Sequence, residues 1–130
     1  MKTIDNALLD RLIDEAKDSP RLRIGMDMRN SAEDSSQRML NALMPGTKVD
    51  IHRHKESAES VICLRGRLDE ILYDDNGNET ERIHLSPADG QYGCQVPAGA
   101  WHTVEVFEPS IIFEAKDRKY GEDGSERLIQ

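Results

Sequence analysis

The residues with the clearest potential for chemistry are two histidines that lie two positions apart, His52 and His54. Residues 49–54 predict a short strand, in which side chains at alternate positions point to the same face. Both imidazoles can therefore reach one metal ion. Glu59 follows at the start of the next predicted strand, and a tight loop between antiparallel strands would bring its carboxylate beside the pair.

A second cluster lies further along the chain, where Pro97 and Gly99 predict a turn and His102 opens the strand predicted over 101–107. If this strand pairs near the first segment, His102 supplies a fourth ligand. Three neutral imidazoles and one carboxylate suit one first-row divalent ion, with Mn(II) or Fe(II) favoured and Ni(II) or Zn(II) as alternatives. An octahedral ion held by four protein ligands keeps two positions for water or substrate.

This spacing resembles the cupin superfamily. Its first motif has fixed positions that are all matched here, by Gly46, His52, His54, Glu59 and Gly66. The core of the second motif is matched by Pro97, Gly99 and His102, but Val106 stands where the family usually has asparagine. The resemblance implies a cupin double-stranded β-helix, or jelly-roll barrel, with a mononuclear site formed by His52, His54, Glu59 and His102.

Further stretches resemble the WbuC family of cupin-fold metalloproteins. They are Gln37-Arg38-Met39, Pro45-Gly46-Thr47, Tyr73-Asp74-Asp75-Asn76-Gly77, Trp101-His102-Thr103 and Phe113-Glu114-Ala115-Lys116. These small bacterial proteins often accompany O-antigen and polysaccharide gene clusters, so the resemblance implies a link to surface polysaccharide metabolism. The reaction of that family is not established, so the resemblance indicates a fold and a site rather than an activity.

Four more residues are candidates for the ligand pocket. Gln37 and Asn41 share one face of a predicted strand and could contact a ligand, or could form ordinary hydrogen bonds within the sheet. Cys63 shares a face with Glu59 and could point into the barrel, although simple packing is the commoner role. Glu114 shares a face with Lys116 near the end of the fold, where an exposed ion pair is the competing interpretation.

The elements that must position these residues are one helix and a series of short strands. Helical spacing of apolar residues over 3–17, with Thr3 or Asp5 as the cap, predicts an amphipathic helix that covers one face of the fold. Short alternating runs separated by turn signals follow, at 36–43, 49–54, 59–65, 68–73, 79–85, 95–96, 101–107 and 111–116. This pattern predicts an all-β sandwich or barrel. We expect an N-terminal helix over 1–20, a single cupin domain over 21–120 and a polar tail over 121–130, which is a candidate for disorder.

Composition narrows the function classes. The 130 residues carry a formal net charge of −8, which disfavours binding to nucleic acid or to an anionic membrane surface. The N-terminal stretch interleaves acids with its leucines and does not resemble a signal peptide, so we expect a cytoplasmic protein. We also expect a homodimer, because open sheet edges favour strand pairing.

Three functions remain compatible with the sequence, because they would share the same metal ligands. The first is an enzyme-like metal site that binds a small sugar or organic acid, in which Glu114 is one option for a general base. The second is a non-catalytic binding or regulatory cupin, and the third is an Fe(II)-dependent dioxygenase. No catalytic residue is assigned from the sequence.

Overall fold

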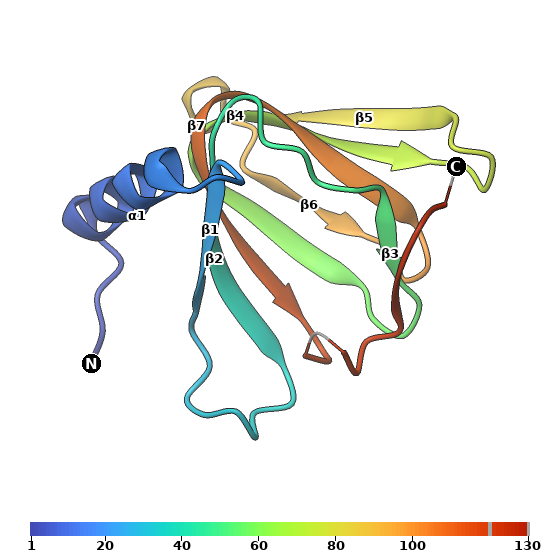
Figure 1. Cartoon of the computed structure of the whole chain (residues 1–130), viewed down its shortest axis with the longest axis horizontal. Coiled ribbons are helices and arrows are strands. Elements are labelled where there is room, and N and C mark those ends of the chain that lie inside the picture. The colour runs from blue at the N-terminus through green and yellow to red at the C-terminus, as the bar shows by residue number, and fades with distance from the viewer. Residues whose placement is uncertain (120, 130) are drawn as a thin grey trace.

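A computed structural model describes residues 1–119 and 121–129, so Tyr120 and Gln130, at the ends of the expected domain and tail, lie outside the described residues. The described chain is mostly β-strand with one N-terminal helix, which confirms the predicted fold class (Figure 1). The elements are α1 (Asn6–Asp18), β1 (Arg23–Asp27), β2 (Gln37–Leu43), β3 (His52–His54), β4 (Glu59–Tyr73), β5 (Glu79–Leu85), the 3₁₀ turn η1 (Pro87–Asp89), β6 (Gly93–Val96), β7 (Trp101–Lys116) and β8 (Ser125–Arg127).

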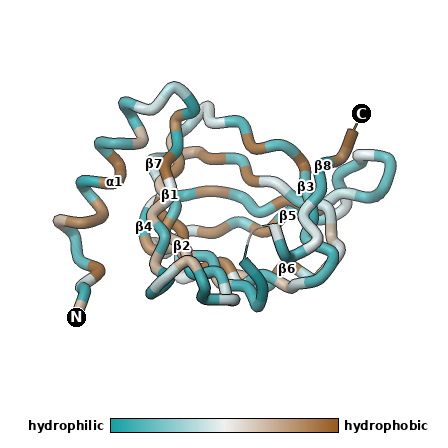
Figure 2. The backbone as a smooth tube through the Cα atoms, turned by 60° about the horizontal axis from the view of Figure 1, so that its bottom comes forward, coloured by the Kyte–Doolittle hydropathy of each residue, from teal (hydrophilic) through white to brown (hydrophobic). Residues whose placement is uncertain are grey.

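Helix α1 lies against the outside of the curled sheet (Figure 2). Its first turn is capped by Asp5, whose carboxylate accepts a hydrogen bond from the backbone N–H of Leu8 at 3.0 Å. The buried face of the helix packs on the outward-facing side chains of β2 and β7, and this cluster includes Leu9, Leu12, Ile13, Ala16, Leu40, Ala42 and Ile111. No helix in the described chain has the length and apolar character of a membrane span.

The strands curl around a second apolar cluster, which fills the interior of the barrel. Strands β4 and β7 are the longest, and they pair antiparallel along most of their length. Around them the sheet runs β1-β2-β7-β3-β8, with β5 and β6 added to β4. The interior cluster is formed by Leu43, Val61, Cys63, Leu68, Leu85, Val96, Val106 and Ile112. Strand β3 occupies the end of this barrel, and that position brings its histidines to one edge of the core.

The strands differ from the sequence prediction in two ways. The predicted pairs 59–65 with 68–73, and 101–107 with 111–116, each form one long strand, because the breaks at Gly66 and Pro109 are irregularities within a continuous ladder. Strands β1 and β8 were not predicted. Strand β8 pairs with β3 inside the tail that was a candidate for disorder, so that expectation was wrong for Ser125–Arg127.

Gly66 allows β4 and β7 to approach each other at this irregularity. Its φ is +95°, in the left-handed region that favours glycine. A Cβ atom at this position would overlap the carbonyl oxygen of Pro109 and would lie 2.7 Å from the Cα atom of Ser110. The last glycine of the first motif is therefore required by both backbone conformation and space.

We expect Gly66→Ala to lower the free energy of unfolding by about 3 kcal/mol, since backbone strain and overpacking add. Gly90→Ala is the matched control, because Gly90 also has a positive φ of +79° but has open space around the Cβ position. The control should lose only about 1 kcal/mol. Urea denaturation measures the free energy of unfolding of both variants. Equal losses of stability would contradict the idea that Gly66 is needed for the close approach of β4 and β7.

Candidate metal centre

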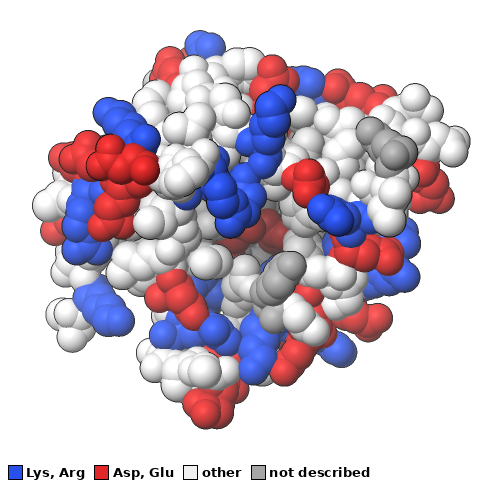
Figure 3. Space-filling model, viewed as in Figure 1, with Lys and Arg blue, Asp and Glu red and all other residues white. Residues whose placement is uncertain are grey.

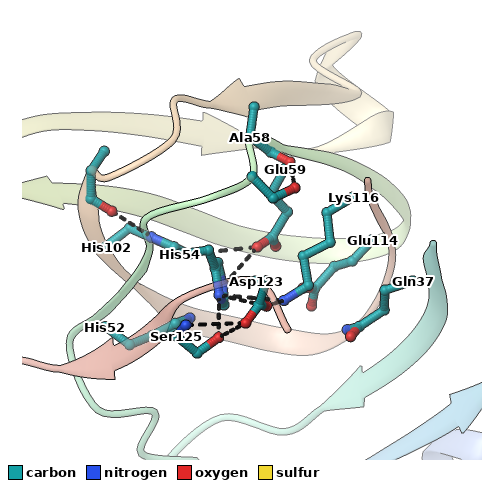
Figure 4. Close-up of polar contacts among 12 residues, drawn as sticks. Gln37, His52, His54, Ala58, Glu59, His102, Glu114, Lys116, Asp123 and Ser125 are labelled. Atoms are coloured by element: carbon teal, nitrogen blue, oxygen red, sulfur yellow. Dashed lines mark hydrogen bonds and ion pairs between the residues drawn. The ribbon is translucent and has the colours of Figure 1, made fainter. Parts of the chain in front are cut away.

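Three histidines meet at the end of the barrel (Figure 4). His52 and His54 lie on β3, and His102 lies at the start of β7, directly opposite His52 in the ladder. One ring nitrogen from each of the three lies within 4.8 Å of the others. The two predicted clusters therefore come together, as the spacing of the histidines indicated.

Hydrogen bonds fix the orientation of two of these rings. The Nδ1 atoms of His52 and His102 lie 2.8 Å from the carbonyl oxygen of Asp50 and 3.0 Å from that of Ala100. Because a carbonyl oxygen can only accept, both Nδ1 atoms carry the hydrogen, and in the neutral imidazole each Nε2 then keeps a lone pair. This is the arrangement found in metal-binding histidines, whose second nitrogen donates to the protein.

Glu59 brings a carboxylate to the same place. Its Oε2 atom lies 3.2 Å from Nε2 of His54 and 3.8 Å from Nε2 of His102. This atom is buried, and it has no hydrogen-bond partner among the described residues. A buried carboxylate oxygen without a hydrogen bond is costly unless a cation balances it. The orphaned oxygen beside the imidazole lone pairs therefore fits a divalent cation.

The electrostatics of the site keep two of the donor groups, His52 and Glu59, in the forms that bind a cation. Burial, together with the neighbouring charge of His102, lowers the pKa of His52 to about 4, so its imidazole is neutral at pH 7. Burial opposes ionisation of Glu59, but polar contacts with the side chains of Glu114, His102 and His54 outweigh it and hold the pKa of Glu59 well below its usual range. Burial, then the Glu59 charge, raises the pKa of Glu114 well above its usual range.

The C-terminal segment supports His54 from outside. Nδ1 of His54 lies 2.7 Å from the hydroxyl of Ser125 and 3.1 Å from the carboxylate of Asp123. Asp123 is fully buried and forms an ion pair of 2.5 Å with the buried ammonium group of Lys116. The backbone carbonyl of Asp123 also accepts a hydrogen bond from the N–H of Glu56. The segment after residue 120 is thus part of the site.

Two neighbouring cavities, which share the lining residues Arg23, Asn41, His52 and Glu114, lie beside the histidines. The inner one has a volume of about 150 Å³, and its polar lining includes His52, Glu59, Glu70, His102 and Glu114. The outer cleft has a volume of about 990 Å³ and is bounded by β1, β2 and the end of β7. Of the four predicted pocket residues, Gln37 lines the outer cleft, and Asn41 and Glu114 line both cavities. Asn41 donates a hydrogen bond of 2.7 Å to Glu114. Cys63 lines neither cavity and packs in the core.

Sequence reasoning missed three polar residues of the site. Glu70 is buried in the inner cavity, and only its place between two apolar neighbours at alternate positions, Leu68 and Leu72, signals an inward carboxylate. Arg23 lines both cavities but lies in a strand that the sequence did not predict. Asp123 lies in a polar stretch with no local signal of burial.

The curled sheet and its histidine cluster define a cupin-fold protein with a site suited to a metal ion. The match to solved structures supports this fold. The capsular polysaccharide assembling protein CapF of Staphylococcus aureus aligns with a TM-score of 0.70 at 16% identity, over 86% of this chain and 33% of CapF. A cupin superfamily protein of Desulfitobacterium hafniense aligns with a TM-score of 0.59 at 18% identity, over 75% and 78% of the two chains. By sequence, the chain belongs to the family described as a domain of unknown function, DUF6016, whose model matches residues 4–85.

A third comparison agrees on the fold. Protein TT1209 of Thermus thermophilus aligns with a TM-score of 0.66 at 22% identity, over 91% of this chain and 98% of that one. The chain thus spans nearly the whole of TT1209 but only about a third of the length of CapF. No curated protein matches the sequence. The resemblance to the WbuC family stays a prediction.

We expect Asp123→Asn to weaken divalent-metal binding roughly 10–100-fold, because it removes the negative charge that supports His54. Asp117→Asn is the control, since Asp117 is an exposed carboxylate close by in the chain. Competition with a chromophoric chelator measures both affinities. The substitution also removes the negative charge that faces the buried Lys116 ammonium group, so the double variant Lys116→Met/Asp123→Asn should recover stability without recovering affinity. Unchanged affinity in Asp123→Asn would contradict the supporting role.

Glu70 makes the metal-free protein sensitive to pH. Burial raises its pKa to about 8 from an ordinary value of 4.5. Between these values the folded state keeps a proton that the unfolded state releases, so stability falls as the pH rises from about 4.5 to 8. Each pKa unit is worth about 1.4 kcal/mol. We expect Glu70→Gln to flatten this fall in chelator-treated protein, whereas the exposed Glu81→Gln does not. Melting temperatures measured across this pH range test the expectation. The same pH dependence in Glu70→Gln as in the unmodified protein would refute the assignment.

Proposed function

We propose that the protein is a metal-binding cupin that holds one divalent ion through His52, His54, Glu59 and His102 and binds a small polar ligand, a sugar or an organic acid. One observation carries the proposal. Three imidazoles, of which His52 and His102 are oriented by backbone carbonyls, converge beside a buried carboxylate oxygen that has no hydrogen-bond partner in the described chain.

The donor set favours Mn(II) or Fe(II), with Ni(II) and Zn(II) as the alternatives, because it mixes imidazole with carboxylate. When bound, such an ion would polarise a ligand carbonyl or lower the pKa of a bound water. The side chains of the protein position the ligand. Asn41 orients the carboxyl group of Glu114 at the boundary between the two cavities, where it can hydrogen-bond a ligand.

A link to surface polysaccharide metabolism is part of this proposal. It is supported by the sequence resemblance to the WbuC family and by the likeness of the fold to CapF, a capsular polysaccharide assembling protein. Sugars offer adjacent hydroxyl oxygens, which can chelate a metal through two atoms. A cytoplasmic homodimer also remains a prediction, and light scattering of the purified protein would test the oligomeric state.

We expect His52→Ala to abolish stoichiometric metal binding, because it removes one of three converging imidazoles. His84→Ala is the matched control, since His84 is the remaining histidine of the chain and its Nδ1 contacts Asp69 on β4, away from the cluster. Elemental analysis of protein purified without added metal gives the stoichiometry and names the ion. A His52→Ala protein with a full equivalent of metal would refute the ligand set.

The unmodified protein, loaded with Fe(II), also distinguishes ligand binding from oxidation. It is mixed with a panel of sugars and organic acids, and its thermal stability and the oxygen concentration are measured. We expect thermal stabilisation by a ligand without oxygen uptake. Uptake that depends on both Fe(II) and a substrate would instead identify a dioxygenase.

A further inference from the structure

The two cavities differ in charge. The inner one holds the carboxyl groups of Glu59, Glu70 and Glu114 beside the histidines, and Arg23 also lines it. The outer cleft is bounded mainly by basic side chains, Arg21, Arg23, Arg29, Lys116 and Lys119, although the carboxyl groups of Asp27 and Glu114 also line it. In Figure 3 acidic side chains lie on the floor of the central hollow and basic side chains stand on its rim.

Most of the basic groups in the cleft have a carboxylate partner. Arg29 pairs with Asp27 at 2.9 Å, Lys116 pairs with Asp123, and Lys119 lies 3.4 Å from Glu122. Arg21 and Arg23 differ. Within residues 1–119 and 121–129, no carboxylate oxygen lies within 4.0 Å of either guanidinium group. Arg21 and Arg23 are thus two nearby cations without a carboxylate partner in the described part of a chain whose net charge is −8.

Arg23 is held in place at the junction of the cavities. Its Nη1 atom donates to the carbonyl oxygen of Lys48 at 2.5 Å and to the hydroxyl of Thr47 at 3.4 Å. Arg23 and His52 together line the inner cavity, the outer cleft and a further hollow beside β8. Burial and the charge of Arg21 lower the pKa of Arg23, while Asp50 acts in the opposite direction. Asp50 itself lies 3.4 Å from Arg127.

The backbone between the two arginines is strained. Leu22 has a φ of +56°, which a leucine rarely adopts and which costs roughly 1–2 kcal/mol. Its N–H donates to the carbonyl of Ser19 and its carbonyl accepts from the N–H of Met44, both at 2.9 Å. Strain of this kind is maintained where the surrounding structure requires it, and it gathers at binding sites. Here the strained residue, Leu22, lies between two arginines that line the same cleft.

The size of the inner cavity limits what can bind there. Its volume of about 150 Å³ is below the roughly 300–1,000 Å³ of ordinary ligand pockets. A ligand that reaches the histidines therefore places only part of itself inside, and the remainder lies in the outer cleft beside Arg21 and Arg23.

We infer that the ligand is an anion, with a carboxylate or phosphate group bound by Arg21 and Arg23 in the outer cleft while its hydroxyl or carbonyl oxygens point to the histidines. This inference rests on the proposed metal site for the inner half of the ligand. The arginines bind the oxyanion by charge-assisted hydrogen bonds, and Arg23 is pre-organised for this by its contacts with Lys48 and Thr47. The sugar or organic acid is thus acidic or phosphorylated.

The test uses the full chain, loaded with metal, in calorimetric titrations with glucuronate, glucose 6-phosphate and glucose. We expect at least one charged probe to bind at least about tenfold more tightly than glucose, and that binding to weaken as salt is raised. Tighter binding of glucuronate identifies a carboxylate ligand, and tighter binding of glucose 6-phosphate identifies a phosphate. Equal binding of all three probes, or no binding of either charged probe, would overturn the inference.

Variants assign the effect to the arginines. Arg21→Gln and Arg23→Gln should each weaken the charged probe at least about tenfold, with metal stoichiometry unchanged. Arg21→Gln is the cleaner change, since Arg23 also contributes hydrogen bonds to the fold. Arg11→Gln, on the exposed face of α1, should bind as the unmodified protein does. Charged-probe affinity retained in both cleft variants refutes the inference. A protein that takes up no metal yet binds the anion through these arginines refutes the proposed metal site alone.

Discussion

The pairing of β3 with its two neighbours is the interaction on which the site depends. Strand β3 is only three residues long, and it lies between β7 and β8. The register with β7 sets His52 opposite His102, while the register with β8 sets His54 opposite Ser125. A shift of one residue would turn His52 and His54 to the other face of the strand. Two ladders on one short strand therefore determine both which imidazoles meet and what supports them.

Charge is the second constraint on the inner cavity. Three carboxyl groups share a small buried space, and they cannot all be ionised there without a cation. Two features of the structure reduce the repulsion among these carboxyl groups. The pKa values of Glu70 and Glu114 are raised, whereas Glu59 is the ionised member of the set and faces the histidines. Apart from Arg23, which lines both cavities, the basic side chains lie in the outer cleft.

Much of the candidate site could be predicted from the local spacing of its residues, while the rest depends on contacts between distant parts of the chain. The positions of His52, His54 and Glu59 could be predicted, because strand alternation and one tight loop relate them over a few residues. His102 could be predicted because a proline–glycine turn marks the start of β7. Glu70 could not be placed in the same way. The ladder slips at Gly66, so the inward positions change from odd residues such as Cys63 to even ones such as Leu68 and Glu70.

Asp123 and Arg23 lay beyond prediction for a different reason. Each belongs to a short strand or turn with few apolar residues, and each is positioned by contacts with residues that are distant in the sequence. The fold class was easier, since many strands of regular spacing indicate a barrel even where single boundaries are wrong. Local sequence thus specifies the barrel and part of the candidate metal site, while tertiary contacts determine the residues that support the site and line its cavities.

The contact between His54 and the C-terminal segment also bears on the order in which the protein is assembled. The Ser125 hydroxyl that contacts His54 lies 71 residues further along the chain. Closing so long a loop costs conformational entropy, which the contacts of the strands in between must offset. In the proposed metal site, His54 therefore has its full set of supporting contacts only when β8 is paired with β3.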